Sequence, residues 1–189
     1  VINCLQIKEH ISHLNLEEAL ELVNKLEVEK VLTWYSKITE LNFISLRYFN
    51  AAGYDLKSRI KIPEKNAPNL IPKIMKVILK DEKALKIFGS DYKTKDGTCI
   101  RDYIHVVDLA RAHVLSLKNK IMSNNVYNVG VGKGSSVLEL VNCFEEINNL
   151  NVNYQFGDRR SGDVPEIYAD NSLIKKELNW EPKFSLKDA

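Results

Sequence analysis

The sequence predicts an α/β fold, and two observations carry this prediction. Short apolar runs rich in β-branched and aromatic residues alternate along the chain with longer stretches in which apolar and charged residues recur at helical spacing. Glycine, proline and asparagine separate these stretches, with no internal repeat or low-complexity tract. A chain of 189 residues, 44% hydrophobic and 28% charged, can bury the core that such a fold needs.

The first predicted elements are a long helix and a buried strand. Asn15, with Glu18 three residues later, fits a capped helix start, and the amphipathic pattern that follows predicts a helix to about Ile38. Residues 43–49 form an apolar run ended by Asn-Ala-Ala-Gly, which predicts a well-buried strand. Residues 1–14 carry no clear pattern.

The remainder of the chain predicts one loop and then a regular alternation of helices and strands. Residues 54–68 are polar and contain two prolines, so they predict a loop. Ser136 and Glu139 have the spacing of a capping box at a helix start. The predicted helices cover residues 70–80, 106–117, 136–147 and 171–178, and the predicted strands cover residues 85–88, 126–129 and 152–156.

Composition and charge argue against several classes of protein. The net charge of +2, from 27 basic and 25 acidic residues, argues against a general nucleic-acid surface. No apolar stretch is long enough to span a membrane, and the first residues do not read as a signal peptide. Cys4, Cys99 and Cys143 are odd in number and not paired in spacing, which favours a reducing cytoplasm over a disulfide framework or a zinc site. Because the chain begins with Val instead of Met, we expect a fragment or an unusual start codon.

Residues 126–158 imitate a dinucleotide-binding unit. A strand leads into the run Gly-Val-Gly-Lys-Gly at residues 130–134, and a helix, a second strand and the acidic Asp158 follow, which is the βαβ order expected for NAD. The third glycine comes one residue early, because Ser135 stands at its expected place, and Asn128 interrupts the first strand. We therefore interpret the segment as a tight turn with a capped helix start and place no NAD there.

Four stretches together carry a resemblance to one enzyme family. They read LRYFNAAG at residues 46–53, APNLIP at 67–72, LKIFGSDYKTKDGTCIRDY continuing IHVVDLA at 85–110, and RRSGD at 159–163. In order and spacing they resemble UDP-glucose 4-epimerases of the extended short-chain dehydrogenase/reductase family, from about residue 22 to the end. The third stretch is the most specific, because related sugar dehydratases share its Arg-Asp-Tyr part but generally not the loop before it.

The resemblance implies a fold in two unequal parts and an isomerase activity. Residues 15–53 would be a truncated remnant of a Rossmann-type NAD-binding domain, and residues 54–189 the smaller α/β substrate-binding portion, with 1–14 as an unmatched leader. The implied reaction interconverts UDP-glucose and UDP-galactose, in galactose metabolism, by transient NAD-dependent oxidation at C4 of the sugar. The complete family enzyme binds NAD, and we expect that this chain alone does not.

The diphosphate of a UDP-sugar needs cations that are fixed in place. Arginine offers two parallel donors in a rigid plane and therefore suits phosphate better than lysine does. By similarity to the family, Arg101 and Arg160 would hold the diphosphate. Asn50, at the carboxyl end of a predicted strand, would donate to a phosphate or sugar oxygen, and Asn69, just before a predicted helix, would reach the nucleotide.

The resemblance also assigns residues to the nucleoside and to the cofactor. The uracil edge would be read by the backbone of one strand, through Lys86, Ile87 and Phe88. Tyr103 and Asp163 would line the same pocket, with Asp163 toward the ribose. Phe49 would contact NAD through its backbone. We interpret His105 and His113 as structural histidines and leave them out of the site.

The catalytic pair of the family is incomplete in this chain. Family members use a tyrosine as the base and a lysine four residues later, which lowers the pKa of the tyrosine and bonds the cofactor ribose. Lys25 stands at the lysine position and would serve both roles of that lysine, but Glu21 stands at the tyrosine position. Since a glutamate is normally ionised and would pair with the lysine, we expect no catalysis by this chain alone.

Two alternative functions come from other classes of protein. One is a nucleotide-sugar-binding module without catalysis. The other is a structural protein that pairs through helix 15–38, whose equivalent in the family packs against the partner subunit. We accordingly expect UDP-glucose or UDP-galactose as ligand, a homodimer through this helix, and neither nucleic acid nor membrane as partner.

Overall fold

The computed structural model describes residues 16–57, 59, 69–118 and 125–189, with side chains from Glu27 onward. Its helices are α2 (Leu16–Ile38), α3 (Leu70–Ile78), α4 (Val106–Lys118), α5 (Val137–Asn148), α6 (Ser172–Leu178) and the 3-10 helix η1 (Leu186–Asp188). Its strands are β1 (Ile44–Tyr48), β2 (Asn50–Ala52), β3 (Leu85–Phe88), β4 (Ile100–Arg101), β5 (Tyr103–His105), β6 (Asn125–Val129), β7 (Ser135–Ser136), β8 (Tyr154–Gly157) and β9 (Glu166–Ile167).

Parallel strand pairs dominate the described residues. β1 pairs with β6, β2 with β5, and β3 with β8, all in parallel. β4 lies between β7, which runs antiparallel to it, and β9, which runs parallel. Because parallel neighbours need long crossover connections, and helices supply most of them here, the α/β prediction is confirmed.

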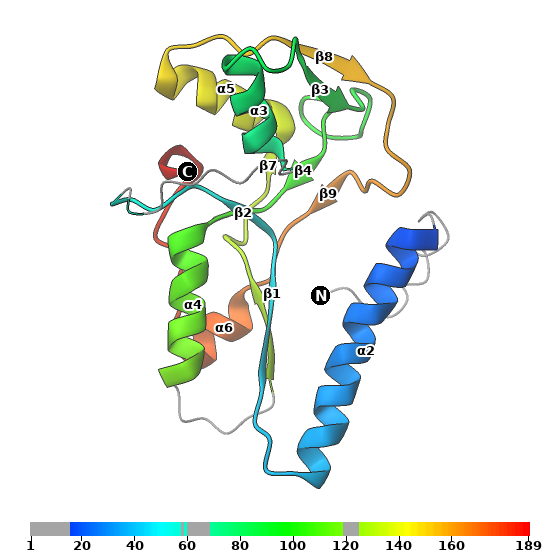
Figure 1. The fold of residues 1–189 in the computed structure, drawn as a ribbon, viewed down its shortest axis with the longest axis vertical. Coiled ribbons are helices and arrows are strands. Elements are labelled where there is room, and N and C mark those ends of the chain that lie inside the picture. Colours follow the sequence, from blue (N-terminus) through cyan, green and yellow to red (C-terminus); the bar gives the residue numbers. More distant parts are fainter. Residues whose placement is uncertain (1–15, 58, 60–68, 119–124) are drawn as a thin grey trace.

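β1 and β2 form one extended segment that changes partner at Phe49. Figure 1 shows this segment running through the middle of the molecule, with α4 and α6 on one side and α2 on the other. The backbone N–H of Asn50 donates to the carbonyl of Asp102 at 3.0 Å, so the segment stays bonded across the change of partner. The segment therefore links the lower part of the fold in Figure 1, which contains α4 and α6, to the upper part, which contains α3 and α5.

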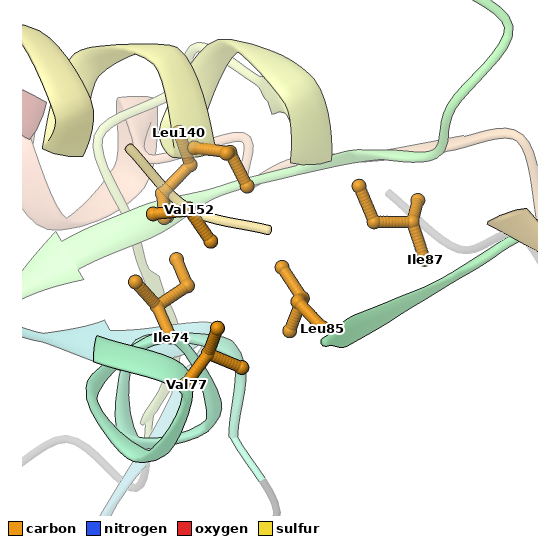
Figure 2. Close-up of a cluster of buried hydrophobic side chains, with 7 residues drawn as sticks. Ile74, Val77, Leu85, Ile87, Leu140 and Val152 are labelled. Atoms are coloured by element: carbon orange, nitrogen blue, oxygen red, sulfur yellow. The ribbon is translucent and has the colours of Figure 1, made fainter. Parts of the chain in front are cut away.

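The upper part is built around one cluster of buried side chains (Figure 2). The cluster joins α3, β3 and α5, and consists of Ile74, Val77, Leu85, Ile87, Leu140, Val141 and Val152. In Figure 2 Ile74 and Val77 of α3 face Leu140 of α5, with Val152 between them and Leu85 at one side. The apolar residues predicted for these three elements therefore share one core, as helical and strand periodicity require.

The lower part has a second core around Trp180. Its buried members are Ile104, Ala112, Tyr127, Val129, Ile174, Leu178 and Trp180, with Ile44 and Leu46 of β1 packed against them. The indole N–H of Trp180 donates to the carbonyl of Asp108 at 3.0 Å. The buried carboxylate of Asp108 in turn accepts the backbone N–H groups of Lys183 at 2.7 Å and Phe184 at 2.9 Å. These bonds fasten the last segment of the chain onto α4.

Helix α5 begins and ends where its sequence predicts. The hydroxyl of Ser136 accepts the N–H of Glu139 at 2.9 Å, and the carboxylate of Glu139 accepts the N–H of Ser136 at 2.9 Å. This reciprocal pair is the predicted capping box. Asn149 follows in the left-handed conformation, with φ of 51°, which stops the helix.

Several predictions needed correction. The strand at residues 43–49 is not well buried: Tyr48 is 57% exposed, because β6 is the one strand that pairs with β1 among the described residues. The strand predicted at residues 152–156 begins at Tyr154 and ends at Gly157. The predicted loop from residue 54 and the cap at Asn15 lie largely outside the described residues.

Five further strands have no counterpart in the prediction, and one of them is β2, where the sequence predicted only the end of the strand at residues 43–49. These strands, β2, β4, β5, β7 and β9, are two or three residues long, and an alternation over so few residues leaves no periodicity to detect. Within the described residues, no helix has the length and apolar character to cross a membrane. The same residues contain no group of three or more metal-ligating side chains.

Candidate functional site

Arg101 and Asp163 form the centre of the candidate site. They are 62 positions apart in the chain, yet one guanidinium nitrogen of Arg101 donates to Asp163 at 3.0 Å. The other terminal nitrogen donates to the carbonyls of Ile100 and Val164, each at 2.8 Å. These bonds use three of the five N–H groups that a guanidinium carries. Since the Arg101 side chain is only 17% exposed, it is held in one orientation by the protein.

Tyr103 and Asn50 lie side by side next to Arg101. They are direct partners in the register between β2 and β5. Tyr103 packs against the upper core, and burial raises the pKa of its hydroxyl to about 12. At neutral pH the phenol therefore keeps its proton and can donate a hydrogen bond. Asn50 was expected at the carboxyl end of a strand, but it is the first residue of β2, because the segment continues past Phe49 with β5 as its new partner. Its exposed side chain adds an amide with both donor and acceptor groups.

Arg160 stacks on Phe88 at the end of β3. Its guanidinium carbon lies 4.1 Å from the centre of the ring, and the ammonium of Lys86 lies 5.2 Å from the same centre. Both cations are exposed and face one aromatic ring, which is a favourable arrangement for cations near solvent. The structure therefore gathers positive charge over the strand that the sequence assigned to uracil.

The backbone of β3 has one edge directed away from β8. The N–H of Leu85 donates to Asn153 at 2.8 Å, and the N–H of Gly89 donates to Gly157 at 2.9 Å, both toward the β8 side. Because successive residues of a strand direct their N–H and C=O groups to alternate edges, Lys86 and Phe88 direct theirs away from β8. The side chain of Ile87 is buried in the upper core.

Asn69 and Phe49 occupy the positions that the sequence predicts, at the ends of elements. Asn69 precedes α3 with extended backbone, and its exposed side chain makes no capping hydrogen bond to the helix. Phe49 is half-buried between β1 and β2. The amide of Asn69 is therefore not used to cap α3.

Lys25 and Glu21 lie on α2, in the part whose side chains are outside the described residues. One helical turn later, Glu29 binds β1: it accepts a hydrogen bond from the hydroxyl of Ser45 at 3.0 Å and from the Nε of Arg47 at 2.8 Å. The Arg47 guanidinium beside it lowers the pKa of the Glu29 carboxyl. These bonds attach α2 to the β1 strand near Phe49.

The glycine-rich turn at residues 130–134 is closed by a carboxylate of the protein itself. Buried Asp102 accepts the N–H of Val131 at 2.8 Å, of Gly132 at 3.0 Å and of Ala169 at 3.1 Å. A side chain at Gly130 would collide with this carboxylate. The two strands of the imitated βαβ unit, β6 and β8, also belong to different sheets. The interpretation as a structural turn is confirmed, and the backbone amides that would cradle a phosphate already bind Asp102.

Sequence reasoning missed the role of Asp102. It lies between Arg101 and Tyr103, with its side chain fully buried beneath the two candidate ligand residues. The Arg-Asp-Tyr run was the available signal, since an acidic residue inside an alternating strand must find partners if it is buried. By contrast, the two histidines are bonded locally: His105 Nδ1 accepts the N–H of Val107 at 3.1 Å, and the Nδ1 of His113 lies 2.9 Å from the Leu109 carbonyl.

Comparison with known proteins gives the family context of these residues. A sequence profile of the NAD-dependent epimerase/dehydratase family matches residues 22–130. The chain is 42% identical over 168 residues to a UDP-glucose 4-epimerase of Bacillus subtilis, which covers 87% of this chain and 50% of the relative. It is 45% identical over 143 residues to a UDP-glucose 4-epimerase of Drosophila melanogaster, covering 73% of this chain and 41% of that protein.

Solved structures agree with the sequence relatives. A UDP-glucose 4-epimerase from Stenotrophomonas maltophila with bound NAD and formylated UDP-arabinopyranose superposes with a TM-score of 0.82 at 39% identity, over 87% of this chain and 50% of that one. A UDP-glucose 4-epimerase from Bifidobacterium longum in complex with NAD+ and UDP gives 0.81 at 36% identity, over 88% and 50%. The chain therefore spans about half the length of the curated relatives it matches.

Proposed function

Because the chain belongs to the NAD-dependent epimerase/dehydratase family, we propose that it is the substrate-binding part of a UDP-glucose 4-epimerase. In this proposal it holds the UDP portion of UDP-glucose or UDP-galactose during their interconversion, an isomerase reaction of cytoplasmic galactose metabolism. The division into a remnant of the NAD domain at residues 15–53 and a substrate-binding portion at 54–189 is part of the proposal.

The observation that carries the proposal is the fixed Arg101–Asp163 pair. A diphosphate is recognised well by a guanidinium that is already oriented, because little conformational entropy is lost on binding. Arg101 is so oriented by one carboxylate and two carbonyls. Asn50 and Tyr103 lie beside it as neutral hydrogen-bonding groups, so a phosphate and a sugar hydroxyl both find partners there.

The arrangement at β3 supports a place for the nucleoside. Lys86 and Phe88 direct backbone donors and acceptors away from β8, which is what the edge of a uracil ring requires. Arg160, over the ring of Phe88, is close enough to this strand to supply the second cation for the diphosphate. Asn69 and Asp163 would complete the contacts to the nucleotide. In this proposal Ile87 supports the strand from the core.

We propose that this chain alone does not bind NAD. The residues assigned to NAD are Lys25 on α2 and the backbone of Phe49. The amides of the glycine-rich turn, which could otherwise bind the NAD phosphates, already bind Asp102. NAD would supply hydride transfer in the complete family enzyme. With Glu21 at the tyrosine position, we propose that the chain alone does not catalyse epimerisation.

The binding proposal is tested by titrating the chain with UDP in a calorimeter. Wild type should bind, and Arg160→Ala should weaken binding by about 10- to 150-fold, the loss expected for charge-assisted bonds to one phosphate. Lys133→Ala is the matched control: it removes an exposed cation from the glycine-rich turn and should leave the affinity unchanged. Absence of UDP binding by the wild-type chain would contradict the proposal.

The activity proposal has its own assay. The chain, supplied with NAD and UDP-galactose, should form no UDP-glucose above the rate without protein. Turnover by the chain alone would show that the catalytic groups are present, and the assignment as a substrate-binding part would then be wrong.

A second candidate, a pairing module, is favoured by one face of α2. Val28, Val31, Tyr35 and Ile38 follow each other at intervals of three, four and three residues, and each is 49–59% exposed. Such spacing forms an apolar seam of the kind that packs against another helix. We propose that a second copy of the chain covers this seam in a two-fold dimer, which does not exclude UDP binding.

Light scattering measures this pairing directly. The wild-type chain should have the mass of a dimer, and Val31→Glu, which places a charge in the seam, should have the mass of a monomer. Lys30→Glu changes the charge of the same helix outside the seam and should remain dimeric. A monomeric wild type would remove this candidate.

A further inference from the structure

We propose that Arg159 and Asp91 are positioning residues, whose bonds hold Arg160 in place over Phe88. This inference rests on the proposed function, because it assigns how one of the phosphate-binding arginines is oriented. Arg159 lies next to Arg160 in the sequence. Its side chain binds the loop after β3, at Asp91.

Arg159 donates hydrogen bonds to two separate acceptors of Asp91. Its Nε donates to a carboxylate oxygen of Asp91 at 2.7 Å, and a terminal nitrogen donates to the backbone carbonyl of the same residue at 2.7 Å. The guanidinium also lies 4.3 Å from the centre of the Tyr92 ring. Two bonds in the plane of the guanidinium and one contact on its face leave it a single orientation.

The loop that carries Asp91 is itself fixed. Gly89 and Gly97 both have φ of 78°, a backbone conformation that other residues adopt at a cost. Between them, the N–H of Tyr92 donates to the carbonyl of Gly97 at 3.0 Å, and Tyr92 is 5% exposed. The hydroxyl of Thr94 donates to the carbonyl of Thr98 at 2.7 Å. Arg159 is therefore attached to a stable support.

The segment around Arg160 depends on this attachment because it has no regular structure. It lies between β8 and β9 and is anchored at three points along its length. Arg159 binds Asp91, Arg160 stacks on Phe88, and Asp163 binds Arg101. The N–H of Asp163 also donates to the carbonyl of Arg160 at 3.3 Å. This turn therefore connects Arg160 to Asp163, the partner of the other proposed phosphate-binding arginine, Arg101.

Stability alone does not account for the Arg159–Asp91 pair. The side chain of Arg159 is 48% exposed and that of Asp91 is 73% exposed. Ion pairs so open to solvent contribute little to folding, because water screens them. The principal consequence of this pair is geometric: it fixes the backbone that presents Arg160.

Replacing Asp91 distinguishes the effect of positioning Arg160 from the effect of charge on UDP affinity. Asp91→Ala removes a negative charge near the proposed diphosphate, so electrostatics alone would strengthen UDP binding. If the pair positions Arg160, the same change should instead weaken UDP binding, by about 3- to 10-fold, because the charge-assisted bonds of Arg160 are lost in part. Asp91→Asn keeps a carbonyl acceptor for Nε and should restore most of the affinity. Asp158→Ala, an exposed acid in the same segment, is the control for charge and should not weaken binding.

Uridine distinguishes positioning from damage to the pocket. It lacks the phosphates that Arg160 would contact, so its affinity, measured by ligand-observed NMR, should be the same for wild type, Asp91→Ala and Arg159→Lys. Equal weakening of uridine and UDP would show a general structural role and overturn the inference, as would unchanged or tighter UDP binding by Asp91→Ala. Failure of wild type to bind UDP would instead contradict the proposed function, so the two failures are distinguishable.

Discussion

The buried carboxylate of Asp102 should be one of the most sensitive positions in the chain. It accepts three backbone N–H groups, from Val131 and Gly132 in the glycine-rich turn and from Ala169 after β9. One oxygen serves Val131, and the other serves Gly132 and Ala169. Because these segments are far apart in the sequence, one side chain joins three parts of the molecule beneath the candidate site.

The cost of two substitutions can be worked out from these bonds. Asp102→Asn can keep a carbonyl oxygen toward Gly132 and Ala169, but its amide group then faces the N–H of Val131. One unsatisfied donor at about 1–3 kcal/mol, plus the weakening of two charge-assisted bonds to neutral ones, gives about 2–4 kcal/mol. Asp102→Ala leaves all three donors without the carboxylate. Since Gly132 is exposed and its N–H can bind water, we expect the free energy of unfolding to fall by about 3–6 kcal/mol, less than the sum for three unsatisfied donors.

Urea unfolding followed by fluorescence measures both free energies, with buried Trp180 as the probe of the lower core. A loss of about 2–4 kcal/mol is a large part of the 5–15 kcal/mol that typically holds a domain together. Asp81→Asn, at an exposed aspartate after α3, should stay within about 0.5 kcal/mol of wild type. If Asp102→Asn were as stable as this control, the view that Asp102 organises the turn in place of a phosphate would be refuted.

Three further predictions concern the cores and the site. Trp180→Phe removes the indole bond to Asp108 and leaves a void in the lower core, so it should lower the free energy of unfolding by about 1–3 kcal/mol in the same urea experiment. Glu139→Ala breaks half of the capping box of α5 and should cost about 0.5–2 kcal/mol, seen as a lower melting temperature by circular dichroism. The pKa of Tyr103 is raised to about 12 in the folded state, so the folded chain binds this proton more tightly than the unfolded chain does. Its contribution to stability should therefore be complete below about pH 10 and be lost as the pH rises toward 12, and Tyr103→Phe should remove that part of the pH dependence in ultraviolet titration and urea unfolding.

The long elements could be predicted because their patterns extend over several turns or alternations. The helices at Leu16–Ile38, Val106–Lys118 and Val137–Asn148 lie within one residue of the predicted bounds. In the last of them, the Ser136–Glu139 spacing marked the helix start as well. Local chemistry was sufficient in these places because helix caps and amphipathic faces depend on neighbours in sequence.

The parts that could not be predicted depend on residues far apart in the chain. The bond between Arg101 and Asp163, the clamp from Arg159 to Asp91, and the three amides on Asp102 each join segments separated by at least 29 positions. No local pattern encodes such partners. The family resemblance named Arg101, Arg160 and Asp163 as site residues, but it gave no reason to expect that Arg101 and Asp163 bind each other.

The exposure of β1 has a similar explanation. Its residues have the composition of a buried parallel strand, which normally has a neighbour on both edges. Within the described residues the structure gives it one neighbour, β6, and the chain spans about half the length of its relatives. Composition therefore predicted the strand correctly and its burial incorrectly.

We expect Arg101 and Arg160, and not the glycine-rich turn, to receive the nucleotide diphosphate. An NMR titration of the isotope-labelled chain with UDP tests it most directly, because each backbone amide reports its own surroundings. Shifts are expected at Lys86, Phe88, Arg101 and residues 159–163, with the amides of Val131 and Gly132 unchanged because they remain on Asp102. Shifts confined to Val131 and Gly132, or no shifts at all, would contradict it.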